Sequence, residues 1–345
     1  MRRKKGLFLL YVLIFSIFLV GCDFSTTMVE NNYKNKLVVH FIDVGQGDST
    51  LIEFPNGETS LIDAGTRNNG EKVINYLQKI GIKKIDYLIA THPHEDHIGG
   101  LPQVIKNFDI GKIYMPNKTQ NTRIFEELLQ EIKSKDLKIS LAKGGDVIIN
   151  EGELKYIILA PNQDNYDDTN NFSIVTKIEY KNNAFIVMGD AEIESEVEIV
   201  EANYDLESNV LRAGHHGSST SSIDEFVEKV NPKYAIISVG KDNTYGHPHK
   251  EVIDIFNKMN IDILRTDEVG DIVFVSDGNE INLLKDINTN TNININSGEY
   301  IGNKNTKIVH KKNCGSLPKE ENRVIFDSLE EAIKNGYKPH DKCTK

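Results

Sequence analysis

The stretch Thr91-His92-Pro93-His94-Glu95-Asp96-His97-Ile98-Gly99-Gly100 places three imidazoles and two carboxylates within the six residues from His92 to His97. It directly follows the apolar run Ile85–Ala90, which predicts a strand that ends in a polar loop. Imidazole and carboxylate groups are common ligands of zinc, manganese and iron. A loop of this composition at the end of a strand therefore predicts a site for divalent metal ions.

The first 22 residues have the pattern of a secretory signal. Four basic residues, from Arg2 to Lys5, precede the apolar run Leu7–Val20 and the pair Gly21-Cys22. This end resembles a bacterial lipobox, in which Cys22 is the lipidated residue. A transmembrane anchor is the alternative, although the run is short for a bilayer span. We expect a protein that is secreted across the cytoplasmic membrane and lipid-anchored on its outer face, with residues 23–35 as a polar tether.

Residues 36–285 read as one domain in which short strands alternate with amphipathic helices. Gly, Pro and Asn turns separate the strands, and apolar residues recur at helical spacing in between. This order predicts an α/β fold of two packed sheets with helices outside. Strands are expected at 37–44, 49–54, 60–63, 138–141, 154–159, 173–180, 184–188, 234–239 and 271–275, and helices at 71–80, 123–134, 192–202, 222–230 and 250–259.

The end of the chain differs in composition. Residues 286–299 are rich in Asn and Thr and are expected to form a flexible linker. Residues 300–345 form a basic module. The formal net charge is −11 although both ends are basic, so the acidic residues gather in the domain between them. Such a domain repels polyanions unless metal ions or a local basic path compensate.

Further metal donors follow other predicted strands. Asp63 ends one strand, Asp190 follows the strand 184–188, and His215-His216 follow the apolar pair Val210-Leu211. Residues 36–285 contain no Cys, so the ligands there must be His, Asp, Glu or Asn. Strand ends tend to meet at one edge of a sheet, where open sheets place their sites.

These motifs, in this order, resemble the metallo-β-lactamase superfamily. The segments Phe41–Ser49, His215–Ser218 and Tyr245–His249 are also similar to the metallohydrolase domain of ComEC-type DNA-uptake proteins. The match covers about residues 37–284. It implies an αββα sandwich with the metal site between the sheet edges.

The resemblance also implies roles for individual residues. His92 and His94 would hold one metal, while Asp96 and His97 would hold a second. Asp190 would bridge the two. His215 would complete the second site, with the neighbouring His216 as the other candidate, and Asp43 and Asp63 would orient the ligand loop as carboxylates behind the metal.

One departure from the superfamily concerns the first metal. Many members supply a further His before the bridging Asp, but no His occurs from Ile98 to Gly189. Asn170–Ser173 occupies that region. An oxygen or a water in place of a nitrogen would weaken zinc binding and favour manganese. Two divalent ions, zinc or manganese, are expected, and an enzyme with one metal is the alternative.

The expected chemistry is hydrolysis by a metal-activated hydroxide, without a Ser or Cys nucleophile. Asp96 would orient the attacking water or accept its proton. His247 is the candidate for stabilising the leaving group, although Gly246 and Pro248 flank it as in a turn. Ser218 and Ser219 could contact a substrate phosphate, and a helix cap is the alternative interpretation of this Ser-rich turn.

The basic module contains two ligand pairs, His310 with Cys314 and His340 with Cys343. This spacing is typical of a small structural zinc site. The module resembles the Ada-type metal-binding module, which usually has Cys where His340 stands. A Cys314–Cys343 disulfide is the alternative outside the cell. A basic module could tether polyanions near the acidic domain.

We therefore expect an extracytoplasmic metal-dependent hydrolase, a phosphodiesterase or nuclease that acts on DNA. DNA or another phosphodiester, the membrane and competence or DNA-processing machinery are the expected partners, and no cofactor nucleotide is expected. One alternative is a hydrolase of a small ester, lactone or phosphocholine substrate, because the same metal centre serves several reactions. The other is a non-catalytic surface protein that binds through its tail.

Overall fold

The computed structural model describes residues 33–284, 292–293, 300–311, 314, 316–319, 322–326, 329–340 and 343–344. The signal peptide predicted for residues 1–22 and the lipidation site at Cys22 lie outside these ranges, as do most of the tether and of the linker 286–299. In the described ranges, no helix is long and apolar enough to cross a membrane.

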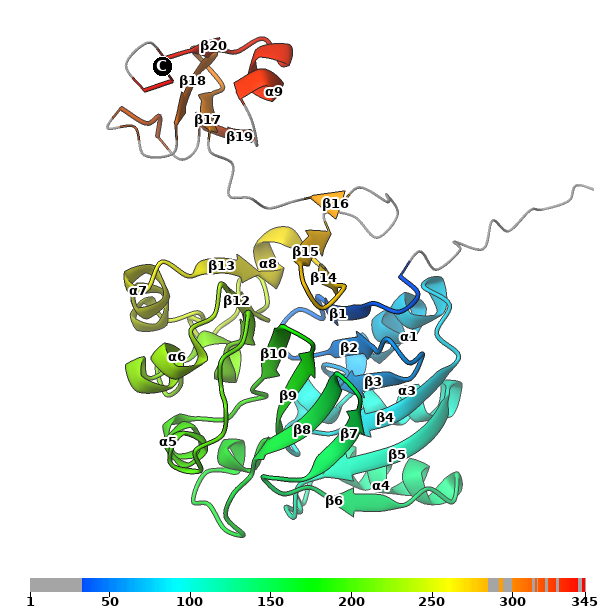
Figure 1. Cartoon of the computed structure of the whole chain (residues 1–345). Coiled ribbons are helices and arrows are strands. Elements are labelled where there is room, and N and C mark those ends of the chain that lie inside the picture. Colours follow the sequence, from blue (N-terminus) through cyan, green and yellow to red (C-terminus); the bar gives the residue numbers. More distant parts are fainter. Residues whose placement is uncertain are drawn as a thin grey trace, which may run out of the picture. The chain divides into compact units, whose positions relative to one another are not determined.

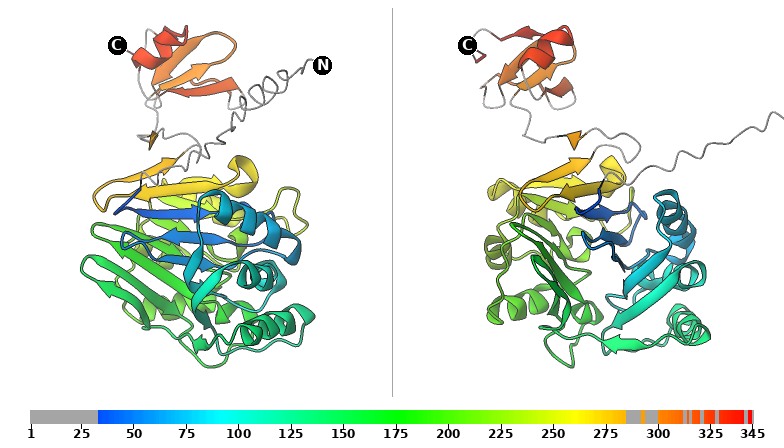
Figure 2. Two further views of the ribbon diagram at one scale, coloured as in Figure 1. Left: turned by 90° about the vertical axis from the view of Figure 1, so that its right-hand side faces the viewer. Right: turned by 45° about the vertical axis from the view of Figure 1, so that its right-hand side comes forward.

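Residues 33–284, together with 292–293, form two β-sheets packed face to face, with helices on both outer faces (Figure 1, Figure 2). In the described part of the chain, the first sheet has the strand order β16-β15-β14-β1-β2-β3-β4-β5-β6. Its strands are β1 Leu37–Phe41, β2 Thr50–Glu53, β3 Thr59–Ile62, β4 Lys84–Ile89, β5 Asp109–Met115, β6 Ile139–Leu141, β14 Ile272–Ser276, β15 Ile281–Leu284 and β16 Asn292–Ile293.

The second sheet has the order β13-β12-β11-β10-β9-β8-β7. In this sheet β10 to β13 run parallel to one another. Its strands are β7 Val147–Glu151, β8 Leu154–Ala160, β9 Val175–Tyr180, β10 Asn183–Val187, β11 Val210–Arg212, β12 Tyr234–Ile237 and β13 Asp262–Arg265.

Three helices pack on each outer face. On the first sheet these are α1 Gly70–Lys79, α3 Leu101–Asn107 and α4 Arg123–Ser134, and on the second α5 Ile193–Glu201, α6 Asp224–Val230 and α7 Lys250–Lys258. Two shorter α-helices, α2 Glu95–Ile98 and α8 Thr266–Val269, and the 3-10 turns η1 Arg67–Asn69, η2 Thr169–Phe172 and η3 Gly214–Gly217 lie in the connections. This arrangement confirms the expected αββα sandwich.

The apolar pattern of the sequence explains the layers. Phe41, Phe185 and Phe274 are completely buried in the cluster between the two sheets. Helix α4 buries Ile124, Phe125, Leu128 and Ile132, which recur at helical spacing on one face. The hydroxyl of Thr122 accepts a hydrogen bond from the Phe125 N–H at 3.4 Å and caps the start of this helix.

The polar loops of the sequence leave the same edge of the sandwich. Strands β3 and β4 are parallel and are followed by Asp63 and by the His92–His97 loop. In the second sheet β10 and β11 are parallel and are followed by Asp190 and by η3. The carboxyl ends of both parallel pairs therefore carry the predicted metal ligands.

The C-terminal module has its own small sheet, with the order β19-β17-β18-β20. Its elements are β17 Tyr300–Asn303, β18 Ile308–Lys311, β19 Arg323–Phe326, α9 Leu329–Lys334 and β20 Lys338–Pro339. The buried apolar cluster of its described residues consists only of Val309, Phe326, Ala332 and Tyr337. The module therefore has little apolar core of its own.

Candidate metal centre

Asp63 fixes the orientation of the ligand loop. Its carboxylate is completely buried and accepts hydrogen bonds from the backbone N–H of Thr91 at 2.9 Å and from the Thr91 hydroxyl at 2.6 Å. The Nδ1 of His97 lies 2.8 Å from the same carboxylate. With Nδ1 held there, Nε2 of His97 faces the opposite way, 3.1 Å from Asp190. Asp63 thus has the supporting position that was expected of it.

Three further donors converge next to His97. His216 directs Nδ1 at the carbonyl oxygen of Ser238, 2.9 Å away. Its Nε2 lies 3.2 Å from Asp96 and 3.4 Å from Asp190. The ligand atoms of Asp96, His97, Asp190 and His216 all lie within 4.8 Å of one another.

The chemistry of this cluster fits a divalent cation. Nε2 of His97 and Oδ1 of Asp190 are buried, and neither has a hydrogen-bond partner among the described residues. Burial opposes a charge on His216, yet the nearby Asp190 and Asp96 raise its pKa to about 10. Burial likewise opposes ionisation of Asp190, but His216 and His97 hold its pKa well below the usual range. The site therefore favours positive charge between its carboxylates.

A second group of donors also lies near Asp190. Nε2 of His92 is 3.0 Å from Nδ1 of His94 and 3.8 Å from Asp190. Burial, together with the nearby His97, holds the pKa of His92 well below its ordinary value, so the ring is neutral and can coordinate a metal. Asn170 lines the same cavity as His94 and Asp190, and its buried Oδ1 has no partner in the described structure. An amide oxygen thus stands near the region where many superfamily members have a His.

The structure distinguishes the two neighbouring histidines. His215, the first choice from the sequence, places Nδ1 3.0 Å from Glu192, and its Nε2 is 4.0 Å from Asp190. His216, the other candidate, is the one that joins Asp96, His97 and Asp190. We therefore assign His216 to the cluster and His215 to the cavity wall.

Asp48, rather than Asp43, lies behind the cluster. Asp43 accepts a hydrogen bond from the Gly45 N–H at 3.0 Å and pairs with Lys72 at 3.1 Å. By contrast, Asp48 is 3.7 Å from both His97 and His216 and pairs with the guanidinium of Arg212. The sequence motif that contains both residues therefore did not predict which of the two carboxylates contacts the metal ligands.

Arg212 is the functional residue that sequence reasoning missed most clearly. It is completely buried, and besides Asp48 it contacts the carbonyl oxygen of Gly189 and Nδ1 of His216. It therefore links the loop before Asp190 to the loop that carries His216. A charged residue inside the apolar stretch Val210–Ala213 was the available signal.

Gly47 allows the loop that carries Asp48 to approach the His92–His97 loop. Its φ is +134°, and a Cβ at this position would lie only 2.3 Å from the carbonyl oxygen of Asp96. The neighbouring Asp48 N–H donates to that same oxygen at 3.1 Å. Any side chain at position 47 would push the two loops apart.

A cavity of about 330 Å³ opens onto both groups of donors. His247 lies in its wall, 5.5 Å from His215 between ring centroids. Burial, followed by the charges of His215 and His216, lowers the pKa of His247 to about 4, so its ring is neutral at pH 7. The lining consists of Gln46, His94, Glu95, Asp96, Asn170, Asp190, His215, His216, Tyr245 and His247.

The two serines expected to contact phosphate lie outside this lining. The Ser218 hydroxyl is 3.0 Å from that of Thr220 and accepts from the Thr220 N–H at 3.3 Å. Ser219 donates its N–H to Nδ1 of His249 at 2.9 Å. Both serines thus stabilise the turn that follows η3, and their contact with a substrate phosphate stays a prediction.

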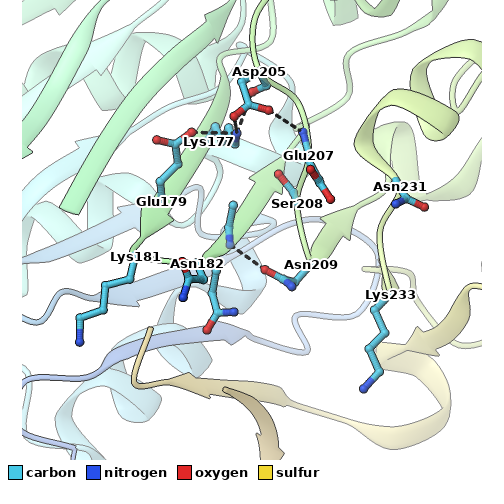
Figure 3. Close-up of a pocket in the computed structure, with 12 residues that line it drawn as sticks. Lys177, Glu179, Lys181, Asn182, Asp205, Glu207, Ser208, Asn209, Asn231 and Lys233 are labelled. Carbon is cyan, nitrogen blue, oxygen red and sulfur yellow. Dashed lines mark hydrogen bonds and ion pairs between the residues drawn. The ribbon is translucent and has the colours of Figure 1, made fainter. Parts of the chain in front are cut away.

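Figure 3 shows the residues that line another hollow, of about 300 Å³. These residues include Asn183, Asn209 and Lys233, at the amino ends of β10, β11 and β12, whereas the metal ligands follow the carboxyl ends of β10 and β11. The buried Lys177 of this hollow donates to Glu179 at 2.8 Å and to the carbonyl oxygen of Asp205 at 2.7 Å. The charge of Lys177 is therefore already satisfied within the protein.

The C-terminal module brings its four predicted ligands together. His310, Cys314, His340 and Cys343 have ligand atoms within 4.8 Å of one another, and Sγ of Cys314 is 3.5 Å from His310 and 3.6 Å from His340. Both cysteines are free thiols, so the alternative disulfide is not formed. Two thiols and two imidazoles form a donor set that suits structural zinc.

Known proteins resemble both parts of the chain. The family described as "Metallo-beta-lactamase superfamily" matches residues 42–241, and "Metal binding domain of Ada" matches residues 290–345. ComE operon protein 3 of Bacillus subtilis is 34% identical over 68% of this chain and 32% of the relative. Competence protein ComA of Neisseria gonorrhoeae is 30% identical over 70% of this chain and 32% of the relative.

The chain thus spans about a third of the length of these relatives. Among solved structures, the metallo-beta-lactamase fold protein YhfI from Bacillus subtilis is 12% identical over 66% of this chain and 96% of that chain, with a TM-score of 0.44. The family match covers more than half of the chain and includes the His92–His97 loop and both Asp190 and His216. This protein therefore belongs to the metallo-β-lactamase superfamily of metal-dependent hydrolases, in a subgroup with ComEC-like competence proteins, and carries a C-terminal Ada-like zinc-binding module.

Proposed function

We propose that this protein is an extracytoplasmic metal-dependent phosphodiesterase that cleaves DNA. The observation that carries the proposal is the cluster of Asp96, His97, Asp190 and His216, in which all but Asp96 are buried, beside a cavity open to substrate. Support for DNA as the substrate comes from the competence proteins among the relatives.

The donors present suggest two places for metal. Asp96, His97, Asp190 and His216 would hold one divalent ion, zinc or manganese. His92, His94 and Asp190 would hold a second one together with the amide oxygen of Asn170. When bound, such ions polarise the phosphodiester and supply a nucleophile from water near neutral pH.

The side chains of the protein position these donors and the substrate. Asp63 and the Ser238 carbonyl hold the rings of His97 and His216 so that Nε2 of each faces Asp190. Asp96 lines the cavity, where it can orient an attacking water. His247, which is neutral at pH 7, can donate a hydrogen bond to the leaving oxygen.

We also propose that the protein is exported and held at the membrane through lipidated Cys22. The basic residues, apolar run and Gly21-Cys22 pair support this proposal. The Cys22→Ser variant should lose incorporation of labelled fatty acid and appear in the medium. Retention of label by this variant would contradict lipidation at Cys22. We propose in addition that the basic C-terminal module tethers DNA near the metal centre and that DNA-processing machinery is a partner of the protein.

The function can be tested with the purified protein loaded with zinc or with manganese. We expect cleavage of DNA oligonucleotides and of a small chromogenic phosphodiester, and no comparable turnover of a lactone, a carboxylic ester or a phosphocholine ester. The Asp96→Ala variant should lose about 100-fold or more in kcat. Asp164→Asn, a change on the exposed surface, is the control. Absence of phosphodiester cleavage with both metals would refute the proposal.

A further inference from the structure

We propose that Tyr245 is a platform on which an unpaired nucleobase of the substrate stacks beside the reacting phosphodiester. The inference rests on the proposed phosphodiesterase function and names its substrate as single-stranded nucleic acid. Tyr245 lies in the loop between β12 and α7 and lines the cavity at the metal centre.

Because the cavity lining is acidic, binding of a nucleic acid there needs a contact other than an ion pair with phosphate. The lining includes the acidic residues Glu95, Asp96 and Asp190, and it contains no Lys or Arg among the described residues. Proteins that hold nucleic acid through its backbone neutralise phosphates with basic side chains. Here the lining offers no such side chain, so binding of the nucleotides beside the reacting phosphate must come from another type of contact.

Tyr245 provides the surface for that contact. It is 65% exposed and is the only aromatic residue among the exposed large apolar side chains of the described structure. The Tyr245 hydroxyl has no hydrogen-bond partner among the described residues, so this hydroxyl does not stabilise the fold. Stacking of a base on an exposed aromatic ring is the usual way in which single strands are bound without reading their sequence.

The ring is held in place before substrate arrives. Tyr245 stacks on His247, with centroids 5.7 Å apart and an angle of 20° between the ring planes. The side chain of Asn243 fixes the loop: Oδ1 accepts from the N–H groups of Tyr245 at 3.2 Å and His247 at 3.0 Å, and Nδ2 donates to the His247 carbonyl at 2.7 Å. An aromatic ring that is already ordered loses little entropy when a ligand stacks on it.

The geometry favours an unpaired base over a duplex. In a double helix both faces of each internal base are covered by its neighbours, and bases become available for stacking on protein side chains in single strands, loops and ends. Because every nucleobase has a flat π-face, the platform would accept all of them. A small ester with an aromatic group is the competing occupant, and the test separates it.

The test combines a change in the protein with a change in the substrate. The full protein, loaded with zinc or manganese, is given a single-stranded thymidine oligonucleotide or the same strand with abasic residues beside the cleaved linkage. For the wild type we expect removal of the bases to lower kcat/KM by about tenfold or more, mainly through KM. For Tyr245→Leu the same removal should change kcat/KM by less than about twofold, because the stacking contact is already gone.

Two further variants make the result specific. Tyr245→Phe keeps the ring and should respond to base removal like the wild type. Leu141→Ala removes an exposed apolar side chain from β6 and should also respond like the wild type. Equal cleavage of both strands by the wild type would overturn the inference, as would an equal loss in Tyr245→Leu. If neither the oligonucleotide nor the chromogenic diester is cut but an aromatic ester is, the proposed function fails as well.

Discussion

Arg212 and Asp48 form a buried ion pair directly behind the proposed metal ligands. The guanidinium is completely buried, and Asp48 is almost completely buried. Burial raises the pKa of Asp48, and the charge of Arg212 opposes that rise. A buried pair of this kind costs desolvation energy, but removal of one partner leaves an uncompensated charge. The pair should therefore matter to stability independently of any bound metal.

We expect Arg212→Met to lower the free energy of unfolding by about 3–5 kcal/mol, because Asp48 then remains buried without its partner. Adding Asp48→Asn to this variant should restore part of the loss. Urea unfolding of metal-free protein, followed by circular dichroism, measures both effects. A loss below about 1 kcal/mol, in the range of an exposed ion pair, would show that the pair is not important for the fold.

At the scale of residues, the sequence identified the side chains that can bind metal, but not which of them contact one another. Strand-end motifs correctly indicated that His97, Asp190 and one of His215 and His216 would meet. The choice between the last two depends on the backbone, since both adopt left-handed conformations, with φ of +46° and +54°. No propensity predicts such a turn. Asp48 and Arg212 were missed because their pairing joins segments far apart in the chain.

Helix α5 connects to the start of α6 through a buried carboxylate. Glu196 is completely buried and accepts hydrogen bonds from the backbone N–H groups of Ser222 at 2.6 Å and Ile223 at 2.9 Å. Burial raises the pKa of Glu196 to about 7, although the two N–H groups favour the charged form. The helix pair therefore contains a group whose protonation is linked to folding.

Stability should fall as the pH rises through this pKa. The folded protein binds the proton of Glu196 more tightly than the unfolded chain, so the favourable contribution is complete below about pH 4.5 and is lost by about pH 7. The loss is about 3 kcal/mol in the free energy of unfolding. Glu196→Gln should remove this part of the pH dependence, whereas Glu201→Gln, on the exposed side of the same helix, should keep it. Parallel urea midpoints for Glu196→Gln and wild type from pH 5 to 8 would contradict this linkage.

At the scale of elements, hydrophobic periodicity predicted most strands and helices within a few residues. The helix expected at 123–134 has these bounds in the structure. Strand β5 was missed because Gly111 and Lys112 interrupt its apolar pattern. The glycine is needed there, since a Cβ would lie 2.4 Å from the carbonyl oxygen of Asp86 in the neighbouring β4. The need for glycine at position 111 comes from a contact between two strands, and the sequence of one strand alone does not reveal that contact.

For the whole molecule, the C-terminal module depends on a group outside its apolar core. Among the described residues of the module, the buried apolar cluster has only four members, which are too few to stabilise a domain of this size, and a structural metal is the usual remedy. The ligand set of two histidines and two cysteines lies where such a metal would bind. Folding of the module and binding of zinc should therefore be one event.

Removal of one ligand should unfold the module and leave the sandwich intact. We expect Cys314→Ser to lower bound zinc, measured by atomic emission, by about one ion per chain. Amide hydrogen exchange should then become fast in 300–311 and stay slow in the strands of 33–284. Thr306→Ala, in the β17–β18 turn, is the control. Slow exchange in 300–311 despite the loss of zinc would show that the metal is not needed for the module.

The pairing of β1 has a consequence for the timing of folding. Strand β1 lies between β2 and β14, and Leu37 at its start is in register with Ser276. The ribosome therefore releases a wholly buried strand long before one of its two neighbours exists. Until β14 has been synthesised, β1 presents an unpaired apolar edge, which is a typical starting point for aggregation. Until almost the entire sandwich has been synthesised, the edge of β1 must be kept from pairing with wrong strands of the same chain or of neighbouring chains.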